Sequence, residues 1–281
     1  MPAARISDLL RVPPRPIDLH RVDTRATPGF DGGKADAEAE RPALAERLST
    51  LQEQLYAEGR TGGRRSVLLV LQGMDTSGKG GTVRHVVGQV DPAGVRAVAF
   101  GPPTAEERRH DFLWRLRRRL PPPGAIGVFD RSHYEDLVTV RVRGLADSRT
   151  WKRRYGSINR FEAQLAANGT RVVKCFLHIS PAEQRERLRA RLDDPAKRWK
   201  FNPGDLDDRE RWDDYFVAYA DAIERCNTET APWYVVPADR KWYRNWAITR
   251  LLSEQLEEMA LRWPEPSFDV DAQRERLLAT P

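Results

Sequence analysis

Sulfur-containing residues and long apolar runs are scarce in this sequence. It has two cysteines and three methionines among 281 residues, and neither Cys175 nor Cys226 has a metal-type neighbour. This scarcity excludes a disulfide-rich scaffold and a cysteine-rich metal site, and it predicts two buried thiols in a reducing cytoplasm. No apolar run approaches the roughly 20 residues that a membrane-spanning helix requires, and residues 1–11 lack the apolar core of a secretory signal. We therefore expect a cytoplasmic protein without a membrane partner.

Acidic residues are also in deficit, because 41 Asp and Glu face 47 Lys and Arg, which gives a net charge of +6. This excess of positive charge favours a polyanionic partner. Charge alone does not choose between nucleic acid, a membrane surface and polyphosphate. The chain is long enough for one large α/β domain with an appendage.

The most informative stretch is the glycine-rich segment 73–82, GMDTSGKGGT. An apolar run at 67–71 precedes it and a helical pattern of valines follows it at 83–90, so the order is buried strand, turn, helix. This order is typical of a phosphate-binding loop, in which glycines let backbone N–H groups converge on an anion and the new helix adds its positive end. Lys79 would supply a full charge to the phosphate oxygens, whereas the alternative is an ordinary glycine-rich turn. The predicted phosphate-binding residues of this segment are Gly73, Ser77, Gly78, Lys79, Gly80, Gly81 and Thr82.

Two carboxylates are candidates for holding magnesium. Gly80 occupies the position where such a loop normally has the Ser or Thr that binds the ion, so the metal would rely on carboxylates, and Asp75 is the nearest. Asp130 ends an apolar strand predicted at 125–129, where magnesium is usually held in proteins with this loop; its alternative role is a helix N-cap. Arg131, the next residue, can pair with phosphate through two hydrogen bonds.

The segment after Asp130 contains two further candidates. His133 could contact a phosphate or pack in the interior. Glu135 could face a nucleotide or serve as a charge at the start of a helix. The residues themselves leave both pairs of alternatives open.

A polar, charge-rich segment at about 192–212 has the composition of a lid. In kinases with a phosphate-binding loop, an arginine-bearing lid closes over the donor and excludes water, and its charges offset those of the transferring group. The alternative is a solvated helix face whose arginines pair with Glu183 and Glu186. We assign the phosphate-binding role to four cations of this region, Arg191, Lys197, Arg198 and Lys200.

A further run of arginines lies at 108–119, on a helix predicted over 104–120. A linear polyanion needs such a track, because each phosphate needs a counter-charge. A nucleic-acid track usually interleaves aromatic residues, but only Trp114 does so here, which leans toward an inorganic chain. The cations predicted to flank the phosphate-binding loop are Arg64, Arg65 and Arg84.

Apolar strand patterns alternate with helical patterns along the chain, which predicts a parallel, right-handed α/β sheet with ligands at the C-terminal ends of the strands. We divide the chain into an extended N-terminal arm at 1–40, a P-loop domain at 41–263 that includes the lid, and a C-terminal tail at 264–281.

Three blocks together resemble the polyphosphate kinase 2 family. They are 73–82 (GMDTSGKGGT), 129–136 (FDRSHYED) and 191–215 (RLDDPAKRWKFNPGDLDDRERWDDY), and 110–115 (HDFLWR) is also similar to the family. The resemblance implies a thymidylate-kinase-like, three-layer α/β/α core with a helical lid. It also implies a phosphotransferase, dependent on Mg²⁺ or Mn²⁺, that moves phosphoryl groups between inorganic polyphosphate and nucleotides.

The resemblance also implies residue roles. Carried over by position, Asp75 and Asp130 hold the metal and the acceptor phosphate, while Lys79, Arg131 and Arg191 bind the phosphates around the transfer point, and these five form the expected catalytic set. Many members of the family have Asn where this chain has Asp130.

The expected substrates follow from the same resemblance. Glu135 with His133 resembles the subgroup that phosphorylates both AMP and ADP, whereas members that use only nucleoside diphosphates look as though they carry Asn in place of Glu135. The predicted nucleotide-binding residues are Asp75, His133 and Glu135. The implied partners are inorganic polyphosphate, AMP, ADP and ATP, with guanine nucleotides as further candidates and no nucleic acid, and the implied assembly is a homodimer or homotetramer.

Two other functions are compatible with the residues. One is an ATP-dependent nucleoside or nucleotide kinase of the same fold. The other is a catalytically silent P-loop module that binds nucleic acid through its basic faces. Asp75 and Asp130 argue against the second, because a simple anion-binding module has little use for two carboxylates without a metal.

Overall fold

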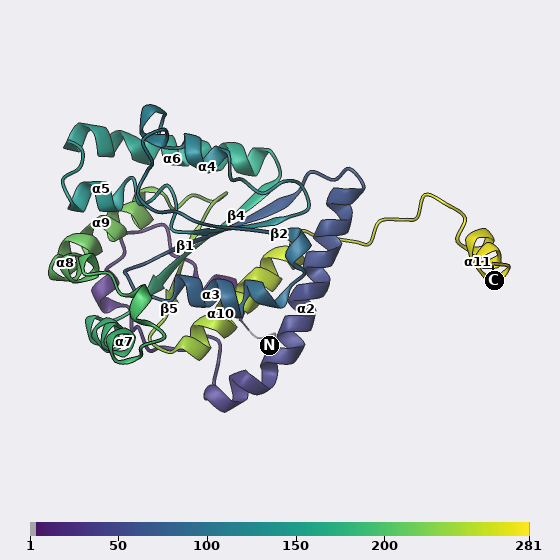
Figure 1. The fold of residues 1–281 in the computed structure, drawn as a ribbon, viewed down its shortest axis with the longest axis horizontal. Helices are drawn as coiled ribbons and strands as arrows, with labels where there is room; N and C mark the ends of the chain where they lie inside the picture. The colour runs from purple at the N-terminus through teal and green to yellow at the C-terminus, as the bar shows by residue number, and fades with distance from the viewer. Residues whose placement is uncertain (1–3, 281) are drawn as a thin grey trace.

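A five-stranded parallel sheet lies between two layers of helices in the computed structural model, which describes residues 4–280 (Figure 1). The strand order is β2-β3-β1-β4-β5, and every neighbouring pair is parallel. The predicted α/β class is therefore confirmed. The strands are β1 (Ser66–Gln72), β2 (Val95–Ala99), β3 (Ile126–Asp130), β4 (Thr170–His178) and β5 (Trp233–Pro237).

The centre of the sheet is apolar because β1 is an unbroken run of apolar residues between two neighbours. The side chains at 67–71 have no exposed surface, as expected for a strand covered on both faces. The register pairs Leu71 of β1 with Asp130 of β3. The segments that follow these two strands, 73–82 and 131–136, therefore start beside each other at one edge of the sheet.

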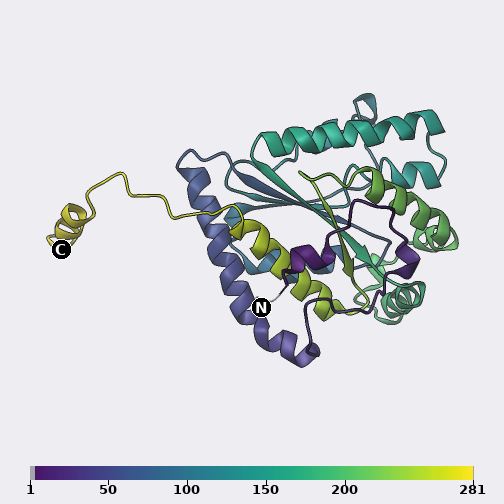
Figure 2. The same cartoon turned by 180° about the vertical axis from the view of Figure 1, so that it is seen from behind.

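Helices cover both faces of the sheet, which accounts for the three layers (Figures 1 and 2). One layer contains α4 (Trp114–Arg117), α5 (Val138–Val142), α6 (Ser148–Ala167) and α9 (Trp212–Arg225). The other contains α2 (Lys34–Arg60), α3 (Lys79–His85) and α10 (Lys241–Glu257). The remaining α-helices are α1 (Ile6–Leu10), α7 (Pro181–Asp193), α8 (Gly204–Glu210) and α11 (Val270–Leu278). Short 3₁₀ turns lie at Leu19–Arg21, Val87–Gln89, Pro92–Gly94, Glu107–Arg109 and Arg198–Lys200.

The N-terminal arm is shorter and more ordered than predicted. Helix α2 begins at Lys34, within the predicted arm at 1–40, because the Asp36 carboxylate accepts the Gly33 N–H at 2.7 Å and caps the first turn. The part of the arm that precedes α2 is not simply extended, since it contains α1, whose Ile6 and Leu10 are buried. Figure 2 shows this part of the chain running over the body of the protein.

The predicted helix at 104–120 is wrong. Only a 3₁₀ turn at Glu107–Arg109 and the short α4 form there. The reason is local capping: the Asp111 carboxylate accepts the Leu113 N–H at 3.0 Å and starts a new turn. Arg115 then points inward and donates to the Asp136 carboxylate at 3.1 Å.

The C-terminal tail leaves the body after α10 and ends in α11, which stands apart from the sheet and its helical layers (Figure 1). Among residues 4–280, no helix combines the length and the apolar composition that crossing a membrane would require.

Candidate active site

The glycine-rich loop joins the end of β1 to the start of α3, at the C-terminal edge of the sheet. Gly73 and Gly78 have φ angles of 144° and 108°, which only glycine adopts readily. Gly78 has a second reason to lack a side chain, because a Cβ there would lie 1.7 Å from Nη1 of Arg244. The loop is therefore held by its glycines and by a buried arginine beneath it.

Lys79 is the cation at the centre of the loop. Its side chain is buried, and Nζ donates to the carbonyl oxygens of Gly73 (2.7 Å) and Met74 (3.3 Å). Burial, and then the nearby charge of Arg131, lower the pKa of Lys79 from its ordinary value. The loop thus holds a poorly hydrated cation, which can exchange its carbonyl contacts for stronger ones to phosphate oxygens.

Asp75 and Arg131 form an ion pair across the loop, with 2.6 Å between Oδ1 and Nη2. Arg131 has a φ of 64°, and its backbone N–H donates to the Leu71 carbonyl at 3.1 Å, so β1 fixes its direction. Burial opposes the charge on Asp75, but Lys79 and Arg131 outweigh it and hold the pKa of the carboxyl below its ordinary value. Burial also opposes the charge on Arg131, whose pKa is nevertheless raised by Asp75 and the other neighbouring carboxylates.

Asp130, at the end of β3, faces the loop. A Cβ built on Gly80 would lie 3.7 Å from Asp130 Oδ2. The Asp130 carboxylate therefore reaches the loop at Gly80, where other loops of this type have a Ser or Thr hydroxyl. This position agrees with the prediction that a carboxylate holds the metal in place of that hydroxyl.

Glu135 lies in the same site. It is half-buried and accepts a hydrogen bond from Thr139 Oγ1 at 2.7 Å. With the Gln72 amide turned to suit its neighbours, its nitrogen donates to Glu135 Oε1 at 3.0 Å. Burial raises the pKa of Glu135, although the charges of Arg131 and Lys79 act against the shift. The hydrogen bonds from Thr139 and Gln72 hold the Glu135 carboxylate beside the loop, where it can contact a bound acceptor.

The structure does not place His133 with the loop. Its ring has no exposed surface, and Nε2 lies 3.0 Å from Oε1 of Glu162. Glu162 also accepts hydrogen bonds from Lys174 (2.6 Å) and the Tyr134 hydroxyl (2.9 Å). A ring enclosed in this way cannot contact a nucleotide, so His133 has the packing role and the nucleotide-binding prediction for it is wrong.

The four cations of the lid divide into two groups. Arg191 is turned toward the loop, where its charge acts on Asp75, and Nη1 lies 3.3 Å from Asp205 Oδ2. The other three are bound within the lid itself. Lys197 pairs with Asp194 at 2.6 Å, Arg198 donates to the Leu192 carbonyl, and the Lys200 ammonium lies over the Trp199 ring. The structure therefore brings Arg191 to the site but not Lys197, Arg198 or Lys200.

Two buried arginines support the loop from below, and sequence reasoning missed both. Arg187 of α7 donates from Nη1 to the carbonyls of Thr76 (2.9 Å) and Ser77 (3.0 Å). Its Nη2 donates to the carbonyls of Ala238 (2.6 Å) and Asp239 (3.0 Å). The one sequence signal for Arg187 is its place between Gln184 and Leu188, which are buried on the same helix.

Arg244 of α10 is the second support. Its Nη1 lies 3.4 Å from the Ser77 carbonyl, and Nη2 donates to Asn245 Oδ1 at 2.8 Å. Burial, with the nearby charge of Arg187, lowers the pKa of Arg244 to about 10. No local pattern in the sequence links α10 to the loop.

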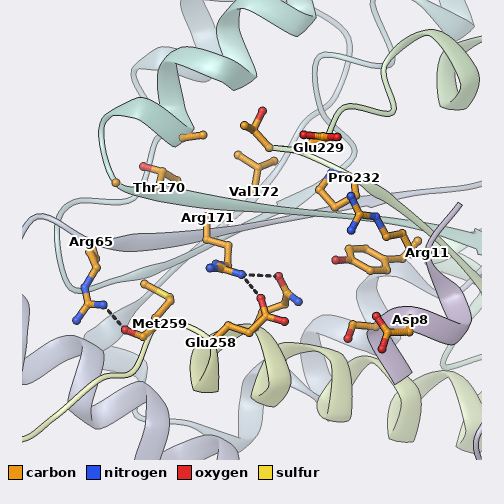
Figure 3. A pocket seen from close by; sticks show the side chains of 16 residues that line it. Asp8, Arg11, Arg65, Thr170, Arg171, Val172, Glu229, Pro232, Glu258 and Met259 are labelled. Carbon is orange, nitrogen blue, oxygen red and sulfur yellow. Dashed lines mark hydrogen bonds and ion pairs between the residues drawn. The ribbon is translucent and has the colours of Figure 1, made fainter. Parts of the chain in front are cut away.

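A cavity of about 520 Å³ lies at the opposite edge of the sheet, where β4 begins (Figure 3). Two of the cations that line it, Arg171 and Arg65, are already neutralised. Arg171 donates to Gln255 at 3.2 Å and pairs with Glu258, and Arg65 pairs with Glu58 and donates to the Met259 carbonyl. Arg64 and Arg65 lead into the start of β1, so the prediction that they flank the phosphate-binding loop is wrong.

Comparisons with known proteins agree with this geometry. The family model described as Polyphosphate kinase 2 matches residues 32–264. An AMP/ADP-polyphosphate phosphotransferase of Meiothermus ruber is 49% identical over 250 residues, covering 89% of this chain and 92% of the relative. An ADP-polyphosphate phosphotransferase of Rhodopseudomonas palustris is 41% identical over 274 residues, covering 93% and 92%. The crystal structure of polyphosphate kinase 2 from Arthrobacter aurescens TC1 superposes with a TM-score of 0.96 at 50% identity, covering 99% of this chain and 98% of that chain.

Proposed function

The chain belongs to the polyphosphate kinase 2 family, and from this premise we propose that it transfers phosphoryl groups reversibly between inorganic polyphosphate and AMP or ADP. The observation that carries the proposal is the convergence of Lys79, Arg131, Asp75 and Asp130 at the ends of β1 and β3. Two cations and two carboxylates around one glycine-rich loop are suited to holding both phosphates and a metal.

The reaction needs no side-chain nucleophile. An oxygen of the acceptor's terminal phosphate is already ionised, and it forms a bond to the terminal phosphorus of polyphosphate as the bond to the rest of the chain breaks. Lys79 and Arg131 offset the charge on the oxygens of the transferring group, and Arg191 adds a third cation from the lid side. Catalysis is therefore positioning and charge neutralisation.

We assign Mg²⁺, or Mn²⁺ in its place, to Asp75 and Asp130. The residues fit, because the Asp130 carboxylate faces Gly80 and Asp75 lies within the same loop. Within the part of the chain that the structure describes, no cluster of three or more His, Cys, Asp or Glu could hold a metal alone. That suits Mg²⁺, which takes its remaining ligands from substrate phosphates and water. When bound, the ion neutralises charge on the phosphate oxygens.

The acceptors in this proposal are AMP and ADP, with guanine nucleotides as further candidates. Glu135 supports the use of both phosphorylation states, because it stands in the site with Lys79 and Arg131. The relative from Meiothermus ruber, named for both AMP and ADP, supports the same assignment.

The cytoplasmic location and the homodimer or homotetramer also belong to this proposal. The location is supported by Cys175 and Cys226, which are buried free thiols.

The test is nucleotide formation from AMP and from ADP, offered separately with Mg²⁺ and long-chain polyphosphate. We expect ADP from AMP and ATP from ADP. Product from ADP alone would keep the polyphosphate reaction and remove AMP from the acceptors. Absence of product from either, with turnover of a nucleoside by ATP, would replace the proposal with an ATP-dependent kinase.

A further inference from the structure

One face of the protein carries many exposed cations away from the candidate site. Helices α4 and α6 lie side by side in Figure 1: Arg117 of α4 lies over the Phe161 ring of α6 at 5.5 Å, and Arg154 of α6 lies over the ring of Phe112, which precedes α4, at 5.0 Å. We call the outer surface of these helices the α4–α6 basic face. Its exposed cations are Arg117, Arg118, Arg119, Arg149, Lys152, Arg153 and Arg160.

The α4–α6 basic face lacks acidic partners. The sequence has no Asp or Glu at 112–129 or at 148–161. Among the described residues, one cation of this face forms an ion pair: Arg117 pairs with Asp111 at 3.3 Å. Arg160 donates a hydrogen bond to the Ser157 hydroxyl at 3.3 Å. Asp147, which caps the first turn of α6, is close enough for its charge to act on Arg153; apart from Asp147 and Asp111, the face has clustered cations with little compensating charge.

Other helices of the same chain compensate their arginines. Arg187 pairs with Glu183 on α7, and Arg274 pairs with Asp271 on α11. On α6, Arg149 and Arg153 are instead a like-charge pair at i and i+4, which destabilises a helix. Both also lie in its first turns, where the helix dipole disfavours cations. An arrangement that costs helix stability in this way is expected where an anion offsets it.

The two tryptophans of the face help to identify the anion. Trp114 is stacked on His110 at 4.1 Å and is covered by Arg118 at 4.9 Å. The Trp151 ring has Arg141 at 4.7 Å and Lys152 at 5.5 Å. Non-specific binding of single-stranded nucleic acid uses aromatic rings that are free to stack on bases. Rings already occupied by His, Arg and Lys favour a polyanion that has phosphates and no bases.

The face also adjoins the candidate site. Arg154, in the second turn of α6, donates to the backbone carbonyl of Asp136, which follows Glu135 in the chain. The first turns of α6 therefore contact the segment that carries Glu135, at the border of the candidate site.

We propose that the α4–α6 basic face is a second, non-catalytic binding surface for inorganic polyphosphate, which holds the distal part of a long donor chain while its end reacts at the loop. This inference rests on the proposed function. It predicts that the face contributes to binding of long chains and contributes nothing to short ones.

The experiment uses the full chain with three substitutions on α6, Arg149→Gln, Arg153→Gln and Arg160→Gln. KM and kcat are measured with long-chain polyphosphate and with tripolyphosphate as donors. We expect KM for the long chain to rise about tenfold, with a weaker dependence on salt because fewer counterions are displaced. We expect KM for tripolyphosphate and both kcat values to stay unchanged.

Two controls separate the face from net charge and from folding. A variant with Arg262→Gln, Arg274→Gln and Arg276→Gln removes three exposed charges from the segment that follows α10 and is expected to behave as wild type. A variant with Arg149→Lys, Arg153→Lys and Arg160→Lys retains the positive charges and is expected to have the wild-type KM. An unchanged KM for the long chain, or an equal rise for both donors, would overturn the proposal.

Binding measurements distinguish this inference from the proposed function. Long-chain polyphosphate should bind the wild-type protein more tightly than the α6 variant even if no nucleotide is formed, so a failure of turnover leaves the binding result readable. Equal binding by both proteins would refute the surface. A loss of duplex DNA binding or of self-association in the α6 variant, without a change in polyphosphate binding, would assign the face to that other partner instead.

Discussion

The two edges of the sheet use arginine and lysine in opposite ways. At the C-terminal edge, Lys79 contacts only carbonyl oxygens, and beside it Asp75 of the loop pairs with Arg131, which follows β3. At the opposite edge, Arg171 and Arg65 are each matched to a glutamate around a cavity of about 520 Å³ (Figure 3). The second edge carries this cavity, whereas the first carries the residues suited to the chemistry.

The difference shows that the partners of a cation indicate its role better than the size of the space beside it. A guanidinium that already pairs with a surface carboxylate has little to gain from a phosphate. A buried ammonium that is held by carbonyl dipoles gains a full ion pair when a phosphate arrives. The predictions below test this contrast between the two edges and the interior that joins them.

The largest effect is expected in the interior, for Glu162→Gln. Lys174 has no exposed surface and would lose the carboxylate that lies 2.6 Å away. Removing one partner of a buried ion pair typically costs about 3–5 kcal/mol. Chemical denaturation of the variant measures the loss, with the exposed Glu186→Gln as a control that should change stability little. A small loss of unfolding free energy would mean that the interior of the sheet tolerates Lys174 without its carboxylate partner.

The same residue gives a pH dependence. Burial opposes the charge on Glu162, but Lys174 and His133 outweigh it, so its folded pKa lies below the ordinary 4.5. The stability from this group is therefore complete above pH 4.5 and is lost as the pH falls through the lower folded pKa. Unfolding midpoints between pH 7 and pH 3 should fall more steeply for wild type than for Glu162→Gln. If the unfolding midpoints of the two proteins fell equally with pH, the lowered pKa of Glu162 would be contradicted.

At the catalytic edge, Lys79→Ala should lower kcat by about 10²–10³, because removing one preorganised charge at a reacting group typically has that effect. The folded structure should persist, since the lysine contacts only carbonyl groups of its own loop. Turnover of ADP with polyphosphate and a thermal unfolding curve give the two readouts. The exposed Lys34→Ala is the matched control, and near-full activity of Lys79→Ala would remove the loop from the mechanism.

Gly78→Ala should destabilise the protein by about 1–3 kcal/mol, the usual cost of a residue forced into an unfavourable backbone region, and lower turnover. Gly62→Ala separates the two causes, because Gly62 has a φ of 97° with open space around it, whereas a Cβ at Gly78 meets Arg244. The loss of unfolding free energy in Gly78→Ala that exceeds the loss in Gly62→Ala should disappear when Arg244→Ala is added. Equal losses of unfolding free energy in the two glycine variants would mean that the Arg244 side chain moves aside without an energetic penalty.

The smallest effect is expected at the opposite edge, for Arg171→Gln. Its ion pair with Glu258 is partly exposed, and pairs of that kind contribute about 0–1 kcal/mol. Stability should change by no more than that and turnover should remain at the wild-type level. A clear fall in kcat would show that the two edges are coupled and that the cavity matters to the reaction.

Local signals in the sequence predict the framework of the site. The strands and the loop at 73–82 follow from apolar runs and glycine spacing, and β3 forms at Ile126–Asp130, one position from the predicted strand at 125–129. The sequence predicts Asp75 and Arg131 as site residues, but the ion pair between them appears only in the structure.

The parts that sequence reasoning missed depend on contacts distant in the chain. Arg187 and Arg244 reach the loop from helices more than 100 positions away, and no local pattern links either residue to the loop. His133 was ambiguous for the same reason, since its role depends on Glu162 of another helix. The helix expected at 104–120 failed because Asp111 caps a new turn inside it.

The four hydrogen bonds that Arg187 donates to backbone carbonyls have a consequence for the order in which the protein acquires activity during synthesis. The carbonyls of Thr76 and Ser77 are joined through this guanidinium to those of Ala238 and Asp239, which follow β5. A ribosome makes the loop early, but Ala238 and Asp239, whose carbonyls hold the Arg187 guanidinium in place, emerge only after the last strand. The nascent chain therefore cannot bind phosphate in its final geometry until it is almost complete, and a premature stop before β5 yields a fragment with the signature motif and no working loop.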